Sequence, residues 1–163
     1  MIAKAESPAV QDPVFSYQTA AAGITYRNVF GGPEKHFILE SHGSGAAFYD
    51  HDGDGDLDLY IANGATFDTY RDRTGPGNEL YRNQGDGTFA EITRQADVGD
   101  AGWAGGVAVG DIDNDGDPDL YISNYGANIL YRNSRGAPYA DIPAPAGVAG
   151  DAYSAGAAFF DYD

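Results

Sequence analysis

Two nine-residue stretches of this chain each place five aspartates in a near-alternating pattern. The first stretch runs from Asp50 to Asp58 and the second from Asp111 to Asp119. Carboxylates this close repel one another, because two unit charges about 5 Å apart cost on the order of 1 kcal/mol even in bulk water. A divalent cation would remove that repulsion. The predicted metal ligands are therefore Asp50, Asp52, Asp54, Asp56, Asp58, Asp111, Asp113, Asp115, Asp117 and Asp119.

The ligand chemistry of these two loops favours calcium. The chain has no cysteine, and no histidine is expected to face the ion, so an all-oxygen set suits a hard cation better than zinc or copper. Four carboxylates and one backbone carbonyl per loop, with a water, approach the roughly six to eight oxygens that calcium prefers. Gly55 and Gly116 can adopt the unusual backbone angles that a tight loop around an ion requires. Magnesium fits less well, because it usually keeps several waters.

The residues that flank each loop predict strands rather than helices. An EF-hand needs a glutamate at its twelfth position and a helix on either side, whereas Ile61 and Ile122 occupy that position here. Small apolar residues precede each loop, and β-branched and aromatic residues follow it. We therefore predict that each loop closes a β-hairpin. The alternative is a pair of solvated turns that bind no metal.

The composition narrows the class of protein. The chain has 163 residues, of which 42% are hydrophobic and 13% aromatic, so it is not a disordered tail. Its 23 glycines and 8 prolines, without long helical periodicity, indicate many short strands. A formal charge of -16 argues against a nucleic-acid partner, since phosphate binding depends on a basic surface.

The sequence also bears on location. The N-terminal residues contain no apolar run long enough for a signal peptide or a membrane span. The lack of cysteine is compatible both with secretion without disulfides and with the cytosol. Because weak calcium loops fill best at millimolar extracellular calcium, we expect an extracellular, periplasmic or cell-surface protein.

Motifs that follow the two loops recur in the same order. Residues 78–83 recur as residues 128–133, and residues 88–93 recur as residues 138–143. The loops start 61 residues apart but these later motifs only 50 apart, so the first copy holds an insertion of eleven residues near 66–76, predicted to be a loop. Each copy therefore contains four strand-like segments.

This repeat predicts an all-β fold, a partial β-propeller of four-stranded antiparallel blades with calcium-binding hairpin loops. The residues after Val14 match a fourth strand, which would close the ring. The last residues match a first strand and the start of a third loop, with Asp161 and Asp163 as ligands of a truncated third site. We therefore expect an N-terminal fragment of a longer protein. The predicted parts are a flexible segment (1–13), a closing strand and long connection (14–44), two blades (45–104 and 105–154) and the start of a third (155–163).

These ordered motifs resemble the FG-GAP/VCBS repeat of calcium-binding β-propellers such as integrin α-subunit heads. A closer resemblance is to the cartilage acidic protein (ASPIC/UnbV) family, over roughly residues 14–163. It implies a calcium-stabilised, secreted or surface-exposed propeller that serves adhesion or ligand binding. The second copy departs from the pattern at residues 134–136 and at Pro118. The motifs that carry the resemblance are residues 45–50, 54–60, 80–83 and 85–89.

The face opposite the calcium loops is the predicted partner-binding surface. The resemblance implies this, because integrin-like heads recognise partners there. The insertion near residues 66–76 belongs to this face. So do three positions that align just before the first strand of each unit: His42, Trp103 and Tyr153. The alternative is that Trp103 and Tyr153 fill the space between blades. The partner is expected to be a protein or a glycan, besides the remaining blades, and the candidate residues are His42, Tyr70, Arg71, Trp103 and Tyr153.

We predict that the chain is not an enzyme. It lacks a Gly-x-Ser-x-Gly elbow, a P-loop and a His-Glu-x-x-His motif. Aspartates around a metal should have depressed pKa values, which suits ligands rather than an acid and base pair. The alternative is the propeller domain of an extracellular hydrolase or lyase that acts on polysaccharide.

Overall fold

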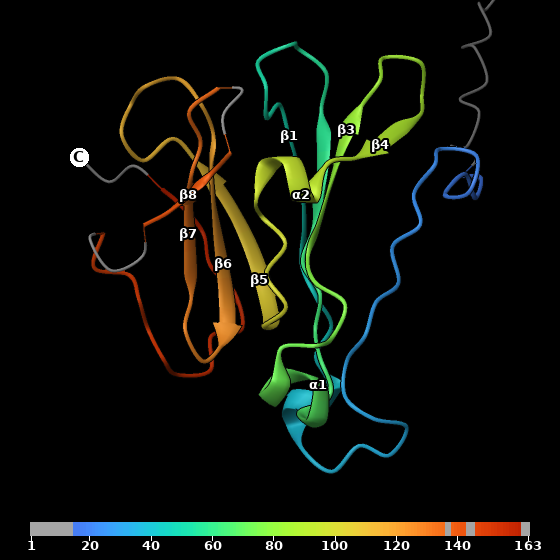
Figure 1. Cartoon of the computed structure of the whole chain (residues 1–163), viewed down its shortest axis with the longest axis vertical. Helices are drawn as coiled ribbons and strands as arrows, with labels where there is room; N and C mark the ends of the chain where they lie inside the picture. Colours follow the sequence, from blue (N-terminus) through green and yellow to red (C-terminus); the bar gives the residue numbers. More distant parts are fainter. Residues whose placement is uncertain (1–14, 136–137, 143–145, 161–163) are drawn as a thin grey trace, which may run out of the picture.

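The computed structural model describes residues 15–135, 138–142 and 146–160. Within them the chain forms two four-stranded antiparallel sheets, each with its strands in chain order. Figure 1 shows the two sheets side by side, with the N-terminal segment running along the first. This confirms the predicted all-β class and the four-stranded unit. The strands are β1 (Ala46–Tyr49), β2 (Asp58–Ile61), β3 (Glu79–Asn83) and β4 (Phe89–Glu91), then β5 (Trp103–Gly110), β6 (Asp119–Tyr125), β7 (Ile129–Arg132) and β8 (Ala140–Asp141).

Both aspartate loops close β-hairpins, as predicted. Tyr49 of β1 pairs with Asp58 of β2, and Gly110 of β5 pairs with Asp119 of β6. The two loops lie at one end of the molecule, together with the β3–β4 turn (Figure 1). Helix α1 (Phe67–Asp72) and the 3-10 helix η1 (Ile38–Ser41) lie at the opposite end. The alternation of connections in an antiparallel sheet therefore separates an acidic end from a helical end.

The main hydrophobic core lies between the two sheets. Tyr60, Leu80, Leu120 and Ile122 are fully buried in one cluster that includes residues of both sheets. Helix α2 (Thr93–Ala96) and Val98 behind it close this cluster. Burial of several large apolar side chains, each of which contributes about 1.5–3 kcal/mol, makes this interface the main source of stability.

A pair of buried tyrosines joins the two sheets. The hydroxyl oxygens of Tyr49 and Tyr139 lie 3.0 Å apart. Burial, the largest cause, raises the pKa of both phenols, so each hydroxyl keeps its proton and can donate. The pair is therefore one neutral hydrogen bond between the end of β1 and the start of the β8 segment.

We expect Tyr49→Phe to lower the free energy of unfolding by about 1–2 kcal/mol, because it leaves a buried hydroxyl of Tyr139 without its partner. Chemical denaturation measures this change. The double variant with Tyr139→Phe should cost less than the sum of the two single variants. Strict additivity would contradict a direct contact between the hydroxyls.

Among the described residues, one hydrogen-bonded turn pattern recurs at three places, after each fourth-strand motif. Its amide-to-carbonyl hydrogen bond runs from Ala22 to Gln18 (2.8 Å), from Ala96 to Ile92 (3.0 Å) and from Ala146 to Ile142 (3.3 Å). The residue after each alanine has a left-handed backbone: Gly23 (φ 77°), Asp97 (φ 56°) and Gly147 (φ 73°). The repeat of the sequence is therefore also a repeat of local structure.

This turn links each unit to the next. The carbonyl of Ala22 accepts a hydrogen bond from the amide of Phe89, and the carbonyl of Ala96 accepts one from the amide of Tyr139, both at 2.8 Å. Phe89 and Tyr139 occupy the same position of consecutive repeats. Successive units are therefore joined by an identical backbone contact.

The described part of the predicted closing strand, residues 15–18, is not paired in a sheet here, so the closing strand stays a prediction. Residues 15–18 take part in none of the strand pairings of the described residues, and residues 19–23 form the first copy of the repeated turn. Phe15 is 92% exposed, so nothing holds this segment flat against a sheet. A strand needs a neighbouring ladder of hydrogen bonds. The bond from the amide of Phe89 to the carbonyl of Ala22 joins β4 to the turn at residues 19–23, not to residues 15–18.

The predicted insertion loop contains helix α1. The side chain of Thr66 accepts a hydrogen bond from the amide of Thr69 at 3.2 Å, which caps the first turn. Arg73, with φ 50°, ends the helix. Strand β5 begins at Trp103, before the expected division between blades after residue 104. The segments 1–13 and 161–163 lie wholly outside the described residues. No helix in the part of the chain that the structure describes is long and apolar enough to cross a membrane.

Candidate metal centre

The first loop gathers three carboxylates. One oxygen from each of Asp50, Asp52 and Asp54 lies within 4.8 Å of the other two. The carboxylate of Asp50 accepts hydrogen bonds from the amides of Gly53 (2.8 Å) and Gly55 (2.9 Å), and both glycines have positive φ. These bonds bend the backbone around Asp50 and bring the alternate side chains to one side.

The second loop repeats this arrangement. Asp111, Asp113 and Asp115 form another group of three carboxylates within 4.8 Å. Asp111 accepts a hydrogen bond from the amide of Gly116 at 3.0 Å, as Asp50 does from Gly55. Asn114 (φ 59°) takes the left-handed position of Gly53. The two loops therefore place three carboxylates at the same loop positions, and a matching backbone hydrogen bond holds the first of them in each loop.

The aspartate at the ninth position of each loop is tied to the backbone. Asp58 is fully buried and accepts hydrogen bonds from the amides of His51 and Asn83, both at 2.8 Å. Asp119 does the same with Ile112 (2.9 Å) and Asn133 (2.7 Å). Each of these carboxylates thus closes its own loop and fastens it to the third strand of the sheet.

Burial raises the pKa of Asp58 and Asp119, even though the backbone amides act in the opposite direction. Aspartates around a metal were expected to have depressed pKa values. Here desolvation of the carboxylate outweighs the hydrogen bonds it accepts. A dication nearby would favour the ionised form, so these two residues would stabilise the loops more when a metal is bound.

The side chains at the seventh position stand apart from the carboxylate groups. Asp56 is exposed, and Asp117 pairs with Arg135, whose Nε lies 2.8 Å from an Asp117 carboxylate oxygen. Asp56 and Asp117 were predicted as ligands, and the one backbone carbonyl counted for each loop belongs to this seventh position. The amides of Asp56 and Asp117 each donate to the aspartate two residues before, at 2.9 Å.

His51 was not expected to face inward, and this expectation is wrong. Its side chain is only 12% exposed, and its Nε2 lies 3.8 Å from a carboxylate oxygen of Asp52. His51, Asp52 and Asp58 form a further group whose ligand atoms lie within 4.8 Å of one another. The backbone carbonyl of His51 accepts a hydrogen bond from Asn133, which follows β7 of the neighbouring sheet. The second loop has Ile112 at this position.

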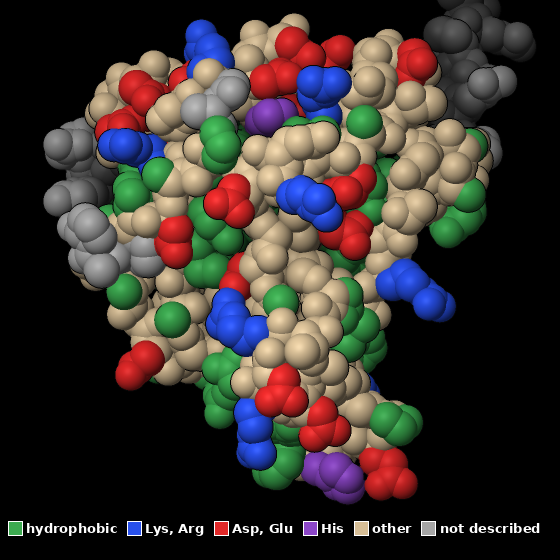
Figure 2. All heavy atoms as spheres, viewed as in Figure 1, with side chains coloured by type: hydrophobic (Ala, Val, Ile, Leu, Met, Phe, Trp, Pro, Cys, Tyr) green, Lys and Arg blue, Asp and Glu red, His purple; other side chains and the backbone are tan. Residues whose placement is uncertain are grey.

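The donor set fits a hard divalent cation. A buried carboxylate oxygen of Asp52, Oδ1, has no hydrogen-bond partner among the described residues. An unpaired buried carboxylate oxygen is costly unless a cation satisfies it. Acidic side chains gather at the end of the molecule that carries the loops (Figure 2). The predicted third site, with Asp161 and Asp163, lies outside the described residues.

A comparison with protein families places these loops in a known repeat. Residues 50–122 match the FG-GAP-like repeat. The matched span begins at the first aspartate of the first loop and ends within β6, so it contains both loops, α1 and α2. The FG-GAP-like repeat supports the FG-GAP part of the resemblance seen in the sequence. No curated protein matches the chain.

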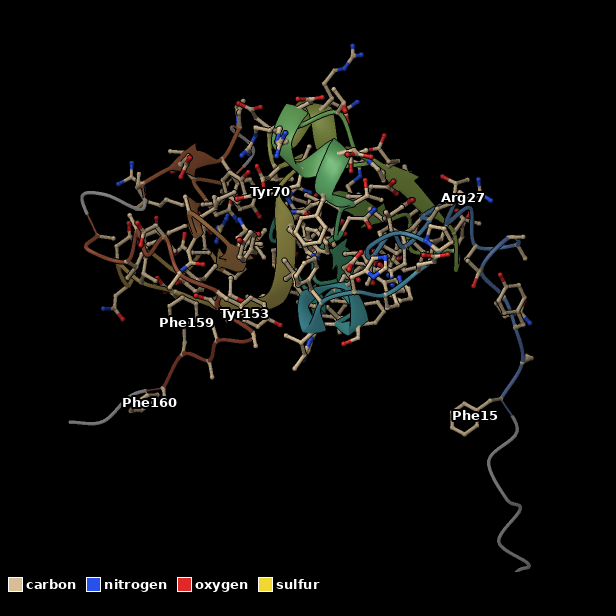
Figure 3. The ribbon with its side chains drawn as sticks, turned by 90° about the horizontal axis from the view of Figure 1, so that it is seen from below. Phe15, Arg27, Tyr70, Tyr153, Phe159 and Phe160 are labelled. Atoms are coloured by element: carbon tan, nitrogen blue, oxygen red, sulfur yellow. The ribbon has the colours of Figure 1, made fainter. Side chains whose placement is uncertain are left out.

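Aromatic rings connect most of the predicted partner-binding residues at the opposite end. Trp103 packs against Phe67 (ring centroids 5.2 Å apart) and Tyr70 (6.3 Å). Tyr125 then links Tyr70 (5.4 Å) to Tyr153 (6.5 Å). His42 lies 5.9 Å from Tyr153, and Arg71 is exposed on α1. Figure 3, seen from below, shows Tyr70 and Tyr153 at this end.

These residues differ in their accessibility to a partner. Trp103 is 1% exposed, which agrees with the alternative that it fills space inside the protein. Tyr153 is 39% exposed and His42 is exposed as well. The accessible part of this surface therefore excludes the indole.

Proposed function

We propose that this chain is a calcium-binding β-propeller segment whose ions stabilise the blades, and that it is not catalytic. The observation that carries this proposal is the pair of matching three-carboxylate groups in hairpin loops within an FG-GAP-like repeat. Calcium would be held by Asp50, Asp52 and Asp54 in the first loop and by Asp111, Asp113 and Asp115 in the second. The bound ion supplies positive charge that cancels carboxylate repulsion.

The ninth aspartate of each loop, Asp58 or Asp119, would offer the ion a further carboxylate oxygen. Asp58 and Asp119 already accept two backbone hydrogen bonds each, which fixes their orientation. A carboxylate oxygen has a further lone pair free for a cation. In the first loop, His51 would lie beside the site, next to Asp52. The all-carboxylate second loop favours calcium over zinc.

We further propose that the protein is related to the cartilage acidic protein (ASPIC/UnbV) family. Its proposed role is adhesion or ligand binding outside the cytoplasm. The motifs around residues 80–89 support the family. Loops that bind calcium weakly need the millimolar calcium found outside the cell, which supports the location. A protein or glycan partner would contact the exposed His42, Arg71 and Tyr153 and the half-buried Tyr70 at the end opposite the loops. Aromatic rings with polar edges suit such contacts.

Isothermal titration of EDTA-stripped protein with calcium chloride tests the proposal. We expect two binding events, because each loop gathers three carboxylates at the same loop positions. The variant Asp50→Asn/Asp54→Asn should remove one event and leave the other. Magnesium chloride is the matched control and should bind more weakly, since magnesium keeps its waters. No binding at calcium levels about tenfold above those that fill extracellular modules, near 10 mM, would refute the proposal.

A further inference from the structure

Two residues that follow β7 contact the two aspartate loops. Asn133, at the end of β7, donates from Nδ2 to the carbonyl of His51 at 2.8 Å. Two residues later, Arg135 donates from Nε to Asp117 of the second loop at 2.8 Å. The same guanidinium borders the first loop, because a Cβ atom at Gly53 would lie 3.1 Å from Nε of Arg135. One positive charge therefore lies beside Asp117 of the second loop and against the backbone of the first loop.

The first repeat has no such charge at the equivalent position. Gly85 aligns with Arg135, and a Cβ atom at Gly85 would lie 3.0 Å from a carboxylate oxygen of Asp56, the counterpart of Asp117. The position thus borders the seventh aspartate in both repeats. Arg135 has φ 21°, on the side of the map that favours glycine, so the arginine is held here at some backbone cost.

We propose that Arg135 is a built-in counter-charge shared by the two calcium loops, which lowers their affinity for divalent cations and holds the loops together when they are empty. The inference rests on the proposed calcium binding. A unit positive charge repels an incoming dication, while it attracts the carboxylates that would otherwise repel one another. The ion pair is solvent-accessible, since the Arg135 side chain is 61% exposed, so the effect is moderate and screened by salt.

Calcium titration of the wild type and Arg135→Gln tests the proposal. We expect the glutamine variant to bind calcium about three- to tenfold more tightly at low ionic strength, because one repulsive charge is gone. Arg135→Lys should stay close to wild type, since it keeps the charge. Glutamine is preferred to glycine because it does not relax the backbone at φ 21°. The gain should shrink in 0.5 M potassium chloride, where the Debye length is about 4 Å.

Arg27→Gln is the matched control for net charge. Arg27 is exposed, and its carbonyl accepts a hydrogen bond from Asn63, beyond the end of β2 that lies away from the loop. Its removal changes the net charge equally but should leave calcium affinity nearly unchanged. Figure 3 shows Arg27 on the N-terminal segment at the side of the molecule.

The outcomes separate this proposal from the proposed function. Weaker calcium binding in Arg135→Gln would overturn it, because the arginine would then act by positioning Asp117. An equal affinity change in Arg135→Gln and Arg27→Gln would also overturn it, since only net charge would matter. If the wild type binds no calcium, both the proposed function and this inference fail. If the wild type binds and Arg135→Gln is unchanged, only the inference fails.

Discussion

Calcium is expected to raise the thermal unfolding midpoint of this protein, and EDTA to lower it again. An ion that binds only the folded state stabilises it by RT ln(1 + [L]/Kd), which is about 2.7 kcal/mol at a hundredfold excess over Kd for each site. The loop carboxylates are gathered only when the hairpins are closed, so the unfolded chain should bind weakly. Differential scanning calorimetry with and without calcium measures the shift.

The shift should divide between the two loops. Asp54 and Asp115 occupy the same position of the two three-carboxylate groups. We therefore expect Asp54→Ala and Asp115→Ala each to reduce the calcium-induced shift by about half, and the double variant to abolish most of it. The surface variant Glu34→Ala is a control and should keep the full shift. A single variant that abolishes the whole shift would show that only one loop binds.

The largest loss of stability without calcium is expected from Asp119→Ala. The Asp119 carboxylate is fully buried and satisfies the amides of Ile112 and Asn133. Its removal leaves two backbone donors without partners, and each unsatisfied buried donor costs about 1–3 kcal/mol. We therefore expect the free energy of unfolding in EDTA to fall by about 2–5 kcal/mol. Urea denaturation measures it.

Asp115→Ala in EDTA is the matched control for Asp119→Ala. Asp115 is an exposed aspartate of the same loop, and its carboxylate accepts one hydrogen bond, from the amide of Asp117. Its loss should cost about 0.5–1 kcal/mol or less. Asp58→Ala should behave like Asp119→Ala, because Asp58 makes the same two backbone contacts. Equal costs for Asp115→Ala and Asp119→Ala would contradict a structural role for the ninth aspartate.

Local patterns in the sequence predicted much of the fold. The hairpins follow from small apolar residues before each loop and β-branched or aromatic residues after it, and the structure pairs Tyr49 with Asp58 as that pattern requires. The repeat of motifs predicted two units with the same strand order. Helix α1 was missed because six residues show too little periodicity, and its threonine cap is also common in turns.

The features that were missed depend on contacts between the two units. His51 contacts the second unit through its carbonyl, which accepts a hydrogen bond from Asn133, 82 residues later. Arg135 lies between the loops only because the sheets pack side by side. The assignment of Asp56 and Asp117 as ligands, like the inward or outward direction of each loop side chain, rested on spacing alone. Spacing sets which residues share a loop, but it does not set which neighbouring surface the loop meets.

The identical backbone contact from each turn to the following unit, at Ala22 with Phe89 and at Ala96 with Tyr139, affects how the protein loses its structure. Units joined only to their immediate neighbours behave as a one-dimensional cooperative array. Local damage in one unit should therefore spread to the unit that follows it along the chain.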